Sequence, residues 1–208
     1  MLNKLFVIGL PRTGTTSLCA ALLAHDFKVA HTAYTRQTFE LAEVFADTPC
    51  FSDYQQLDHL FPGSQFVYLD RDLSAWVPSV RKLLIKMHSN LSPSGHFNPI
   101  IKRCFNETFG LLTHNEPLST SHLTHCHQQH QQQVFDYFAG RDDLLRLDIS
   151  QAGSLTGLLN FMGKTTDQPL DFPHLNGGNK VSAWRNIKHP NKVNSSASGP
   201  QRRRFFDY

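Results

Sequence analysis

Hydrophobic residues in this chain of 208 residues fall into short continuous runs that are separated by longer amphipathic segments. The runs at residues 5–9, 65–70 and 143–149 are rich in leucine, valine and phenylalanine. Their length and composition are typical of strands that are covered on both faces of a parallel sheet. Residues 28–33 form a weaker candidate for a further strand. The pattern therefore predicts several buried strands that lie far apart in the sequence.

Between these runs, apolar residues recur at helical spacing. Helices are predicted over residues 15–27, 36–46, 74–90, 98–112, 119–140 and 153–163. In the second of these segments, Phe39, Ala42 and Phe45 fall on roughly one side of a helix. Strands that alternate with helices predict an α/β fold of three layers, with helices on both faces of a central, mainly parallel sheet.

The length and composition of the chain indicate one domain. A chain of 208 residues with 40% hydrophobic residues can bury one sizeable core, and it is too short for two ordinary domains. From residue 171 onward the pattern dissolves into glycine, asparagine, serine and proline. We therefore expect a single domain over residues 1–190 and a flexible basic tail over residues 191–208.

The charge is modest. A formal net charge of +3 is dispersed along the chain, except for the run Arg202, Arg203 and Arg204, so we expect no nucleic-acid partner. The four cysteines have neither disulfide nor metal spacing, which favours a reducing compartment. The first apolar run is too short for a signal peptide or a membrane span. These observations predict a cytoplasmic protein with no membrane partner.

The stretch GLPRTGTTSL at residues 9–18 follows the first predicted strand and precedes a helix. Gly9, Gly14 and Thr16 are in register with the phosphate loop of nucleoside triphosphatases, but Thr15 occupies the position of the lysine that reaches the β- and γ-phosphates. The missing lysine makes a triphosphate hydrolase or a kinase a poor interpretation. Backbone N–H groups at a helix N-terminus, two threonine hydroxyls and the cation Arg12 still predict a site for a smaller anion.

A second candidate element follows the strand at residues 65–70. Arg71 comes directly after this strand, and Ser79 lies eight residues further on, about two turns into the next predicted helix. Both side chains can reach one phosphate, Arg71 by charge-assisted hydrogen bonds and Ser79 by its hydroxyl. The structural alternative is that Arg71 pairs with Asp70 or Asp72 and that Ser79 is an ordinary helix residue.

Together these elements resemble the sulfotransferases that use 3′-phosphoadenosine-5′-phosphosulfate (PAPS). Their 5′-phosphosulfate loop reads P-K-S-G-T-T or P-R-S-G-T-T, which matches Pro11, Arg12, Thr13, Gly14, Thr15 and Thr16, with Ser17 following. The spacing of Arg71 and Ser79 resembles the element of this family that binds the 3′-phosphate. The resemblance extends over residues 5–176, more loosely at ADTPCF, YFAGRDDLLRLDI and FPHLN.

The resemblance implies a phosphate-loop fold of the sulfotransferase type and a transferase that uses PAPS as sulfuryl donor, forms 3′-phosphoadenosine-5′-phosphate (PAP) and requires no metal. The acceptor would be a hydroxyl or amine of a small molecule or glycan. One departure is that the basic loop of the better-known enzymes near the C-terminus has only a weak equivalent here. Lys180, Arg185 or the run 202–204 are the candidates to complete the 3′-phosphate site.

Each candidate residue has an expected role. Residues 11–17 would hold the 5′-phosphate, and Arg12 would stabilise the leaving oxygen as a fixed cation. The base that accepts the proton of the acceptor is left open among Asp47, from the D-x-P loop of the resemblance, His31, at the end of the second predicted strand, and Asp53.

The segment at residues 122–130 is rich in histidine and is a further candidate site. His122 and His125, or His127 and His130, are i,i+3 pairs on a helix, but glutamines lie nearby and no carboxylate or second cysteine completes a ligand set, so a solvated polar helix face is favoured over a metal site. Trp76 is expected in the core, with stacking on adenine as the alternative.

The competing functions are a small-molecule or nucleotide kinase with an altered loop and a non-catalytic PAP-binding protein of the same fold.

Overall fold

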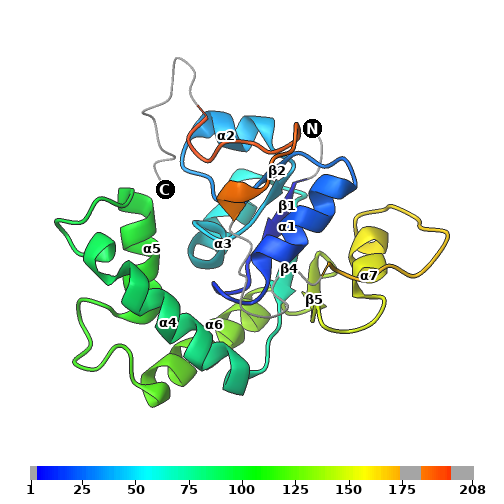
Figure 1. Ribbon diagram of the computed structural model, residues 1–208. Coiled ribbons are helices and arrows are strands. Elements are labelled where there is room, and N and C mark those ends of the chain that lie inside the picture. The colour runs from blue at the N-terminus through cyan, green and yellow to red at the C-terminus, as the bar shows by residue number, and fades with distance from the viewer. Residues whose placement is uncertain (1–3, 174–183, 198–208) are drawn as a thin grey trace.

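The sheet predicted from the sequence is present in the computed structural model, which describes residues 4–173 and 184–197 (Figure 1). In the described residues the sheet has five strands, β1 (Leu5–Val7), β2 (Val29–Ala30), β3 (Val44–Phe45), β4 (Gln65–Leu69) and β5 (Leu144–Leu147). Their order is β2-β3-β1-β4-β5, and every pair of neighbours is parallel. The chain therefore has the expected α/β fold.

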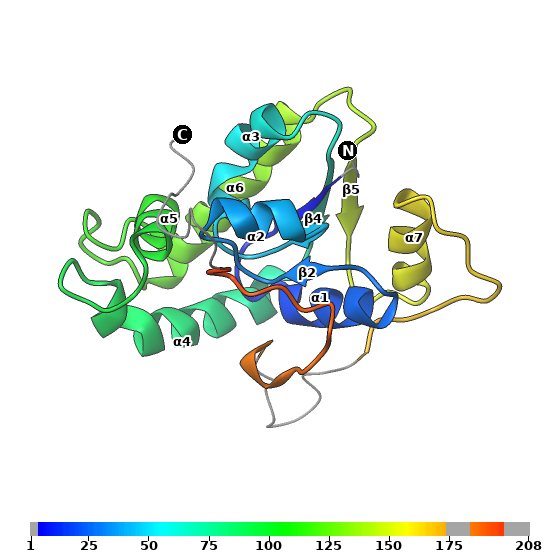
Figure 2. The same cartoon turned by 90° about the horizontal axis from the view of Figure 1, so that it is seen from above.

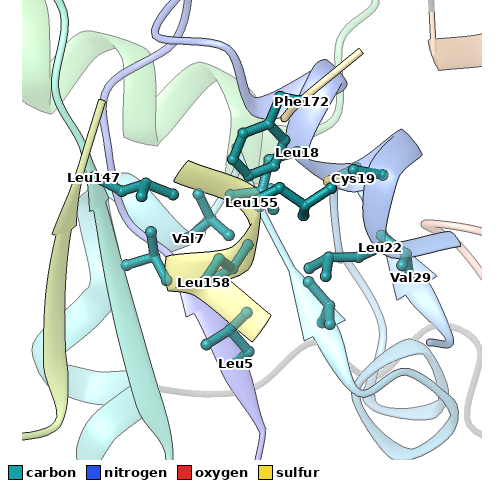
Figure 3. Packing of buried hydrophobic residues seen from close by; sticks show 14 of the residues in the cluster. Leu5, Val7, Leu18, Cys19, Leu22, Val29, Leu147, Leu155, Leu158 and Phe172 are labelled. Carbon is teal, nitrogen blue, oxygen red and sulfur yellow. The ribbon is translucent and has the colours of Figure 1, made fainter. Parts of the chain in front are cut away.

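The central strand, β1, is buried on both faces. Leu5 pairs with Val44 of β3 on one side and with Gln65 of β4 on the other. Because side chains alternate along a strand, Leu5 and Val7 lie in one hydrophobic cluster, whereas Phe6 and Ile8 lie in another, on the opposite face. Figure 3 shows the first cluster, in which Leu5 and Val7 pack with residues of two helices.

Helices cover both faces of the sheet, so that the sheet is the middle one of three layers (Figure 2). Helices α1 (Thr15–Ala24) and α7 (Ser154–Phe161) contribute to the cluster of Leu5 and Val7. Helices α2 (Arg36–Leu41), α3 (Cys50–Leu60) and α6 (Thr120–Tyr137) flank the other face. A third cluster joins α4 (Leu73–Leu91) and α5 (Pro99–Phe109) to α6 and includes Leu10, which follows the carboxyl end of β1.

Two predicted elements need correction. The helix expected over residues 36–46 ends at Leu41, and Val44 and Phe45 form β3 instead. Phe39 and Phe45 still pack together, with ring centroids 5.0 Å apart, so the spacing located the buried side but not the backbone conformation. Helix α3 was not predicted, although Phe51, Tyr54 and Leu57 are buried at helical spacing.

The expected boundary at residue 190 also changes. Within the described part of the chain, residues 191–197 are hydrogen-bonded to the domain: Val29 donates its N–H to the Asn191 carbonyl at 3.0 Å, and Val193 donates to the Val29 carbonyl at 2.9 Å. The Thr38 hydroxyl donates to the carbonyls of Asn194 and Ser195. These residues belong to the folded domain, and residues 198–208 lie outside the described residues.

The order of the strands creates a crevice at the carboxyl ends of β1 and β4. The chain leaves β1 through α1 toward β2 on one side of the sheet, whereas it leaves β4 toward β5 on the other side. Ligands of open parallel sheets bind where the connections diverge in this way. In the described residues no helix is both long enough and apolar enough to cross a bilayer.

Candidate functional site

A cavity of about 670 Å³ opens at this crevice. It brings together segments that follow the carboxyl ends of all the strands: the loop after β1, the residues directly after β2 and β3, and the turns after β4 and β5. The lining includes residues 11–17, His31, Asp47, residues 70–72, residues 148–150, Phe172 and Pro173. Eight of the nine predicted donor-binding residues, all except Ser79, thus line one cavity.

The loop after β1 depends on two backbone conformations that are uncommon elsewhere in the chain. Gly14 has a φ of 111°, and a Cβ at this position would lie 2.2 Å from Ile149 Cδ1, so only glycine fits. Arg12 has a φ of 74°. Of the non-glycine residues with positive φ in the described chain, Arg12 and Asp47 line the cavity, and Asp26 does not. Such conformations are concentrated at functional sites because the surrounding structure must hold them.

The N-terminus of α1 faces this loop. Gly14 is the N-cap and supplies no side-chain hydrogen bond to the helix. The first intrahelical backbone bond from this end runs from the Leu18 N–H to the Gly14 carbonyl, at 3.1 Å. Unpaired N–H groups and the positive end of the helix dipole both favour an anion, so the site has the properties that phosphate binding needs.

The two predicted phosphate elements are in direct contact. Arg12 Nε donates to Ser79 Oγ at 2.9 Å, and Arg71 Nη1 donates to the carbonyl of Arg12. Ser79 thus reaches the site through Arg12. The indole of Trp76 is fully buried and donates to the Pro11 carbonyl at 2.9 Å, so Trp76 is a core residue that supports the loop and does not stack on a ligand.

The electrostatic character of the cavity also favours an anion. The pKa of Arg71 is lowered, first by partial burial and then by the positive charge of Arg12, because two cations so close together repel each other. Four carboxylates belong to the described lining, and each has a partner: Asp70 pairs with Arg146, Asp72 caps the N-terminus of α4, Asp148 accepts from Ser150, and Asp47 faces His31. A negatively charged ligand would relieve the repulsion between the two arginines.

Two of the alternative bases form one pair. His31 Nδ1 lies 3.9 Å from Asp47 Oδ2, since His31 is the first residue after β2 and Asp47 the second after β3, its paired neighbour. His31 Nε2 lies 3.3 Å from the Thr15 hydroxyl and 3.2 Å from the Thr16 hydroxyl. Burial lowers the pKa of His31 and raises that of Asp47, and each charge partly offsets the shift of the other.

Trp184, near the end of the described chain, packs on His31, and Lys192 contacts Trp184 in turn. The Trp184 ring stacks on the His31 ring with centroids 5.3 Å apart. Lys192 donates to the Trp184 carbonyl at 2.6 Å and lies 4.7 Å from the centre of its ring. The sequence did not point to Trp184 as part of the site, because its contact with His31 depends on how residues 191–193 join β2.

Several candidate residues are not brought to the cavity. Asp53 is buried and accepts two hydrogen bonds from Arg103 of α5, at 2.9 and 2.6 Å, which removes it from the candidate bases. Arg185 is exposed and does not belong to the lining. Lys180 and the run 202–204 lie outside the described residues.

The histidine-rich segment of α6 differs from its predicted solvated face. His127 is 2% exposed and His130 is 6% exposed, because this side of the helix packs inward, while the glutamines at 128, 129, 132 and 133 are exposed. No group of three or more histidine, cysteine or acidic residues in the described chain is arranged to hold a metal. The four cysteines are all buried and free.

The fold and the cavity define a parallel α/β protein with a glycine-containing strand-to-helix loop at its topological switch point. The model of the sulfotransferase domain family matches residues 28–181, which is more than half of the chain. The chain therefore belongs to the sulfotransferase domain family, whose activity is sulfuryl transfer in general. The matched range begins after the phosphate loop at residues 9–17, so the loop and the family match are independent observations. No curated protein matches this chain.

Proposed function

We propose that this protein transfers the sulfuryl group of PAPS to a hydroxyl or amine of a small molecule or glycan and releases PAP. The observation that carries the proposal is the shared cavity: the phosphate loop and Arg71 follow adjacent strands and open into the same space of about 670 Å³. A ligand with phosphates at two positions of one adenosine matches two cationic elements that are in contact. The proposal includes a cytoplasmic location, which the absence of disulfides among the four cysteines supports.

The residues fit the donor on structural grounds. The N-terminus of α1, Thr15 and Thr16 would hold the 5′-phosphate, and Gly14 lets the backbone approach it without a side chain. Arg71 would bind the 3′-phosphate, and Ser79 would act by holding the Arg12 guanidinium. No metal is needed for this chemistry, since arginine and backbone dipoles supply the positive charge.

The transfer step moves one group and one proton. The acceptor oxygen or nitrogen forms a bond to sulfur, the bond from sulfur to the bridging phosphate oxygen breaks, and the electron pair of that bond stays on PAP. Arg12 would stabilise the charge that develops on the bridging oxygen, an effect worth about 3–4 kcal/mol in comparable sites. The proton of the acceptor would pass to the pair formed by His31 and Asp47.

We assign His31 as the base and Asp47 as its positioning partner. The lowered pKa keeps His31 neutral near pH 7, where it is able to accept a proton. Asp47 faces Nδ1 of the ring, which leaves Nε2 as the nitrogen that accepts the proton. His31→Gln and Asp47→Asn are each expected to reduce kcat by about 100-fold or more. The double variant should lose little beyond the larger single loss, because residues that act as a unit are not additive. Additive losses would contradict the pair.

Ligand-induced stabilisation tests the donor site directly. We expect PAP to raise the melting temperature, whereas ATP with Mg²⁺ and adenosine 5′-phosphate should have much smaller effects. At about 100 times its dissociation constant, PAP should add about 2.7 kcal/mol, or about 5–10 °C for a domain of this size. Arg71→Ala and Ser79→Ala should diminish the shift. Arg36→Ala is a matched control, since Arg36 is an exposed residue paired with Glu40 on α2.

The outcomes separate the competing functions. A larger shift with ATP and Mg²⁺ would favour the kinase. A PAP shift without transfer of labelled sulfate from PAPS to any component of a metabolite or glycan extract would favour a non-catalytic PAP-binding protein. Isolation of a sulfated product from such an extract would support the transferase and identify the acceptor.

A further inference from the structure

A second cavity, of about 710 Å³, lies on the other side of the sheet from α1. Its lining residues come from α3, from α6 and from the end of α5. It shares no lining residue with the first cavity. The two come near each other in sequence at the start of α3, where Asp47 lines the first, Phe51 lines the second, and the Phe51 N–H donates to the Asp47 carbonyl at 3.3 Å. We call this second cavity the α3–α6 groove.

His130 in the wall of this groove has an unsatisfied ring nitrogen. His130 Nε2 lies 2.8 Å from the Phe51 carbonyl oxygen. Because a carbonyl oxygen only accepts, Nε2 carries the hydrogen and Nδ1 is a bare acceptor. His130 Nδ1 is buried and has no hydrogen-bond partner in the described residues. Burial lowers the pKa of His130 to about 4, so the ring stays neutral and Nδ1 requires a donor from elsewhere.

The rim of the groove carries neutral and acceptor groups. The exposed amides of Gln55, Gln56, Gln129 and Gln133 can each donate and accept. Glu107 and Asp136 add carboxylates, which only accept. One oxygen of each already has a partner: Glu107 pairs with Arg103 at 2.9 Å, and Asp136 accepts from the Gln132 amide at 2.7 Å. No lysine or arginine belongs to the described lining. An anionic ligand would therefore meet no positive charge in this lining, and a purely apolar ligand would leave the amides and His130 unpaired.

Aromatic side chains complete the groove. Tyr54 of α3 and Tyr137 of α6 both belong to the lining, with ring centroids 5.7 Å apart at 72° to each other. Tyr54 is 5% exposed, so the accessible ring is that of Tyr137, which is half-buried. Tyrosine combines an apolar face with a polar edge, so it suits ligands whose faces are C–H and whose edges are hydroxyl groups. The cavity volume lies in the range of pockets that hold small organic ligands.

We propose that the α3–α6 groove binds an uncharged saccharide. Sugar hydroxyls donate to His130 Nδ1 and to the carboxylates, the glutamine amides exchange hydrogen bonds with neighbouring hydroxyls, and a pyranose face packs against tyrosine. This binding does not depend on sulfuryl transfer, and it needs no contact with the donor cavity.

Direct binding tests the groove without any activity measurement. Cellobiose, maltose and lactose are the probes, measured by saturation-transfer difference NMR and by titration calorimetry, with sodium sulfate and spermidine as charged comparisons. We expect at least one disaccharide to bind and neither charged probe to compete with it. Gln129→Leu combined with Gln133→Leu should weaken binding by about tenfold or more, since each variant removes a hydrogen-bonding amide.

The matched control is Gln128→Leu. Gln128 is exposed on the same helix and precedes Gln129, but it does not line the groove, so its variant should bind the sugar as the wild type does. Since these glutamines are exposed, the variants should fold, and unchanged PAP-induced stabilisation would confirm it. The ¹⁵N resonance of His130 Nδ1 provides a second measurement, because it should shift on sugar binding as this nitrogen gains a donor.

Three results would overturn the proposal. One is that none of the three disaccharides binds. Another is that a disaccharide binds but the double glutamine variant and the His130 Nδ1 resonance do not respond. The third is that spermidine displaces the sugar, which would identify the groove as a site for cationic amines drawn by Glu107 and Asp136.

Discussion

Acidification should destabilise this protein through His130, and the size of the effect follows from the burial of one side chain. An unfolded histidine has a pKa near 6.5, whereas burial lowers the pKa of His130 in the folded protein to about 4. Between these two values the unfolded chain binds a proton that the folded chain does not. The stabilisation is therefore complete above about pH 6.5 and is lost as the pH falls toward 4.

The magnitude can be worked out from the two pKa values. One unit corresponds to 1.36 kcal/mol, so the full difference is worth about 3 kcal/mol below pH 4, and about 2 kcal/mol of it is already lost at pH 5. Tyr54 and Tyr68 pack against the His130 ring, and burial raises the pKa of both, so neither changes charge in this range. The pKa of neighbouring His127 is also lowered by burial and adds in the same direction.

Urea unfolding at pH 7 and pH 5, for the wild type and for His130→Gln, isolates the contribution of this residue. Groups common to both proteins cancel in the comparison. The wild type should lose about 2 kcal/mol more than the variant between the two pH values. If both proteins lose the same free energy of unfolding, then His130 is not held neutral by burial, and the description of its Nδ1 as an unpaired acceptor fails with it.

Three other predictions concern the site and its support. Gly14→Ala should lose about 1–3 kcal/mol and abolish PAP-induced stabilisation in melting experiments, because alanine is strained at a φ of 111° and its Cβ, 2.2 Å from Ile149 Cδ1, would also displace this residue of the cavity lining. Gly63→Ala is the control: Gly63 has a φ of 81° and nothing lies within 4 Å of the position of a Cβ, so this variant measures the loss of unfolding free energy from positive φ alone. Trp184→Ala should raise the pKa of His31 toward its ordinary value, because the His31 ring loses the indole that helps to bury it. NMR titration of His31 measures this shift. An unchanged pKa would mean that Trp184 does not contribute to the burial of His31. Asp53→Asn should lower the free energy of unfolding by about 1–3 kcal/mol in urea, since it breaks a two-bond pair in which Asp53 is buried and Arg103 is 39% exposed. Glu40→Gln, in an exposed pair, should lower it by less than about 1 kcal/mol. Equal losses for the two variants would refute this reasoning.

Most of the fold follows from local patterns, and the exceptions have a common cause. Strands β1, β4 and β5 are continuous apolar runs, and α4, α5 and α6 have clear helical periodicity, so both were predictable. Strand β3 has only two residues, and its conformation depends on pairing with β1 and β2, which are distant in sequence. No window around Val44 contains that information. Helix α3 is different, because its buried positions have helical spacing and the signal was available.

The candidate site divides in the same way. The phosphate loop and the pair Arg71 and Ser79 were predictable, because each lies in a short motif next to a strong strand. The contact of His31 with Asp47 required the missed strand β3, since both residues follow paired strands. The contact of Trp184 with His31 required residues 191–193 to join β2, where the sequence indicated a tail.

The position of the cation is our reason for proposing a sulfuryl donor rather than a triphosphate as the ligand of this loop. In a triphosphatase loop, the lysine after the second glycine reaches the β- and γ-phosphates. Here Thr15 holds that place, and the cation is Arg12, which precedes Gly14 and is fixed from the side of β4: Ser79 accepts from its guanidinium and Arg71 donates to its carbonyl. The positive charge is thereby held at the cavity beyond the carboxyl ends of β1 and β4, which Arg12 and Arg71 both line. A ligand that extends from the loop toward Arg71 gains from both cations, whereas a linear triphosphate would find no cation at the lysine position. This difference in charge placement, together with membership of the sulfotransferase domain family, is why the donor that we propose is an adenosine with phosphates at two positions.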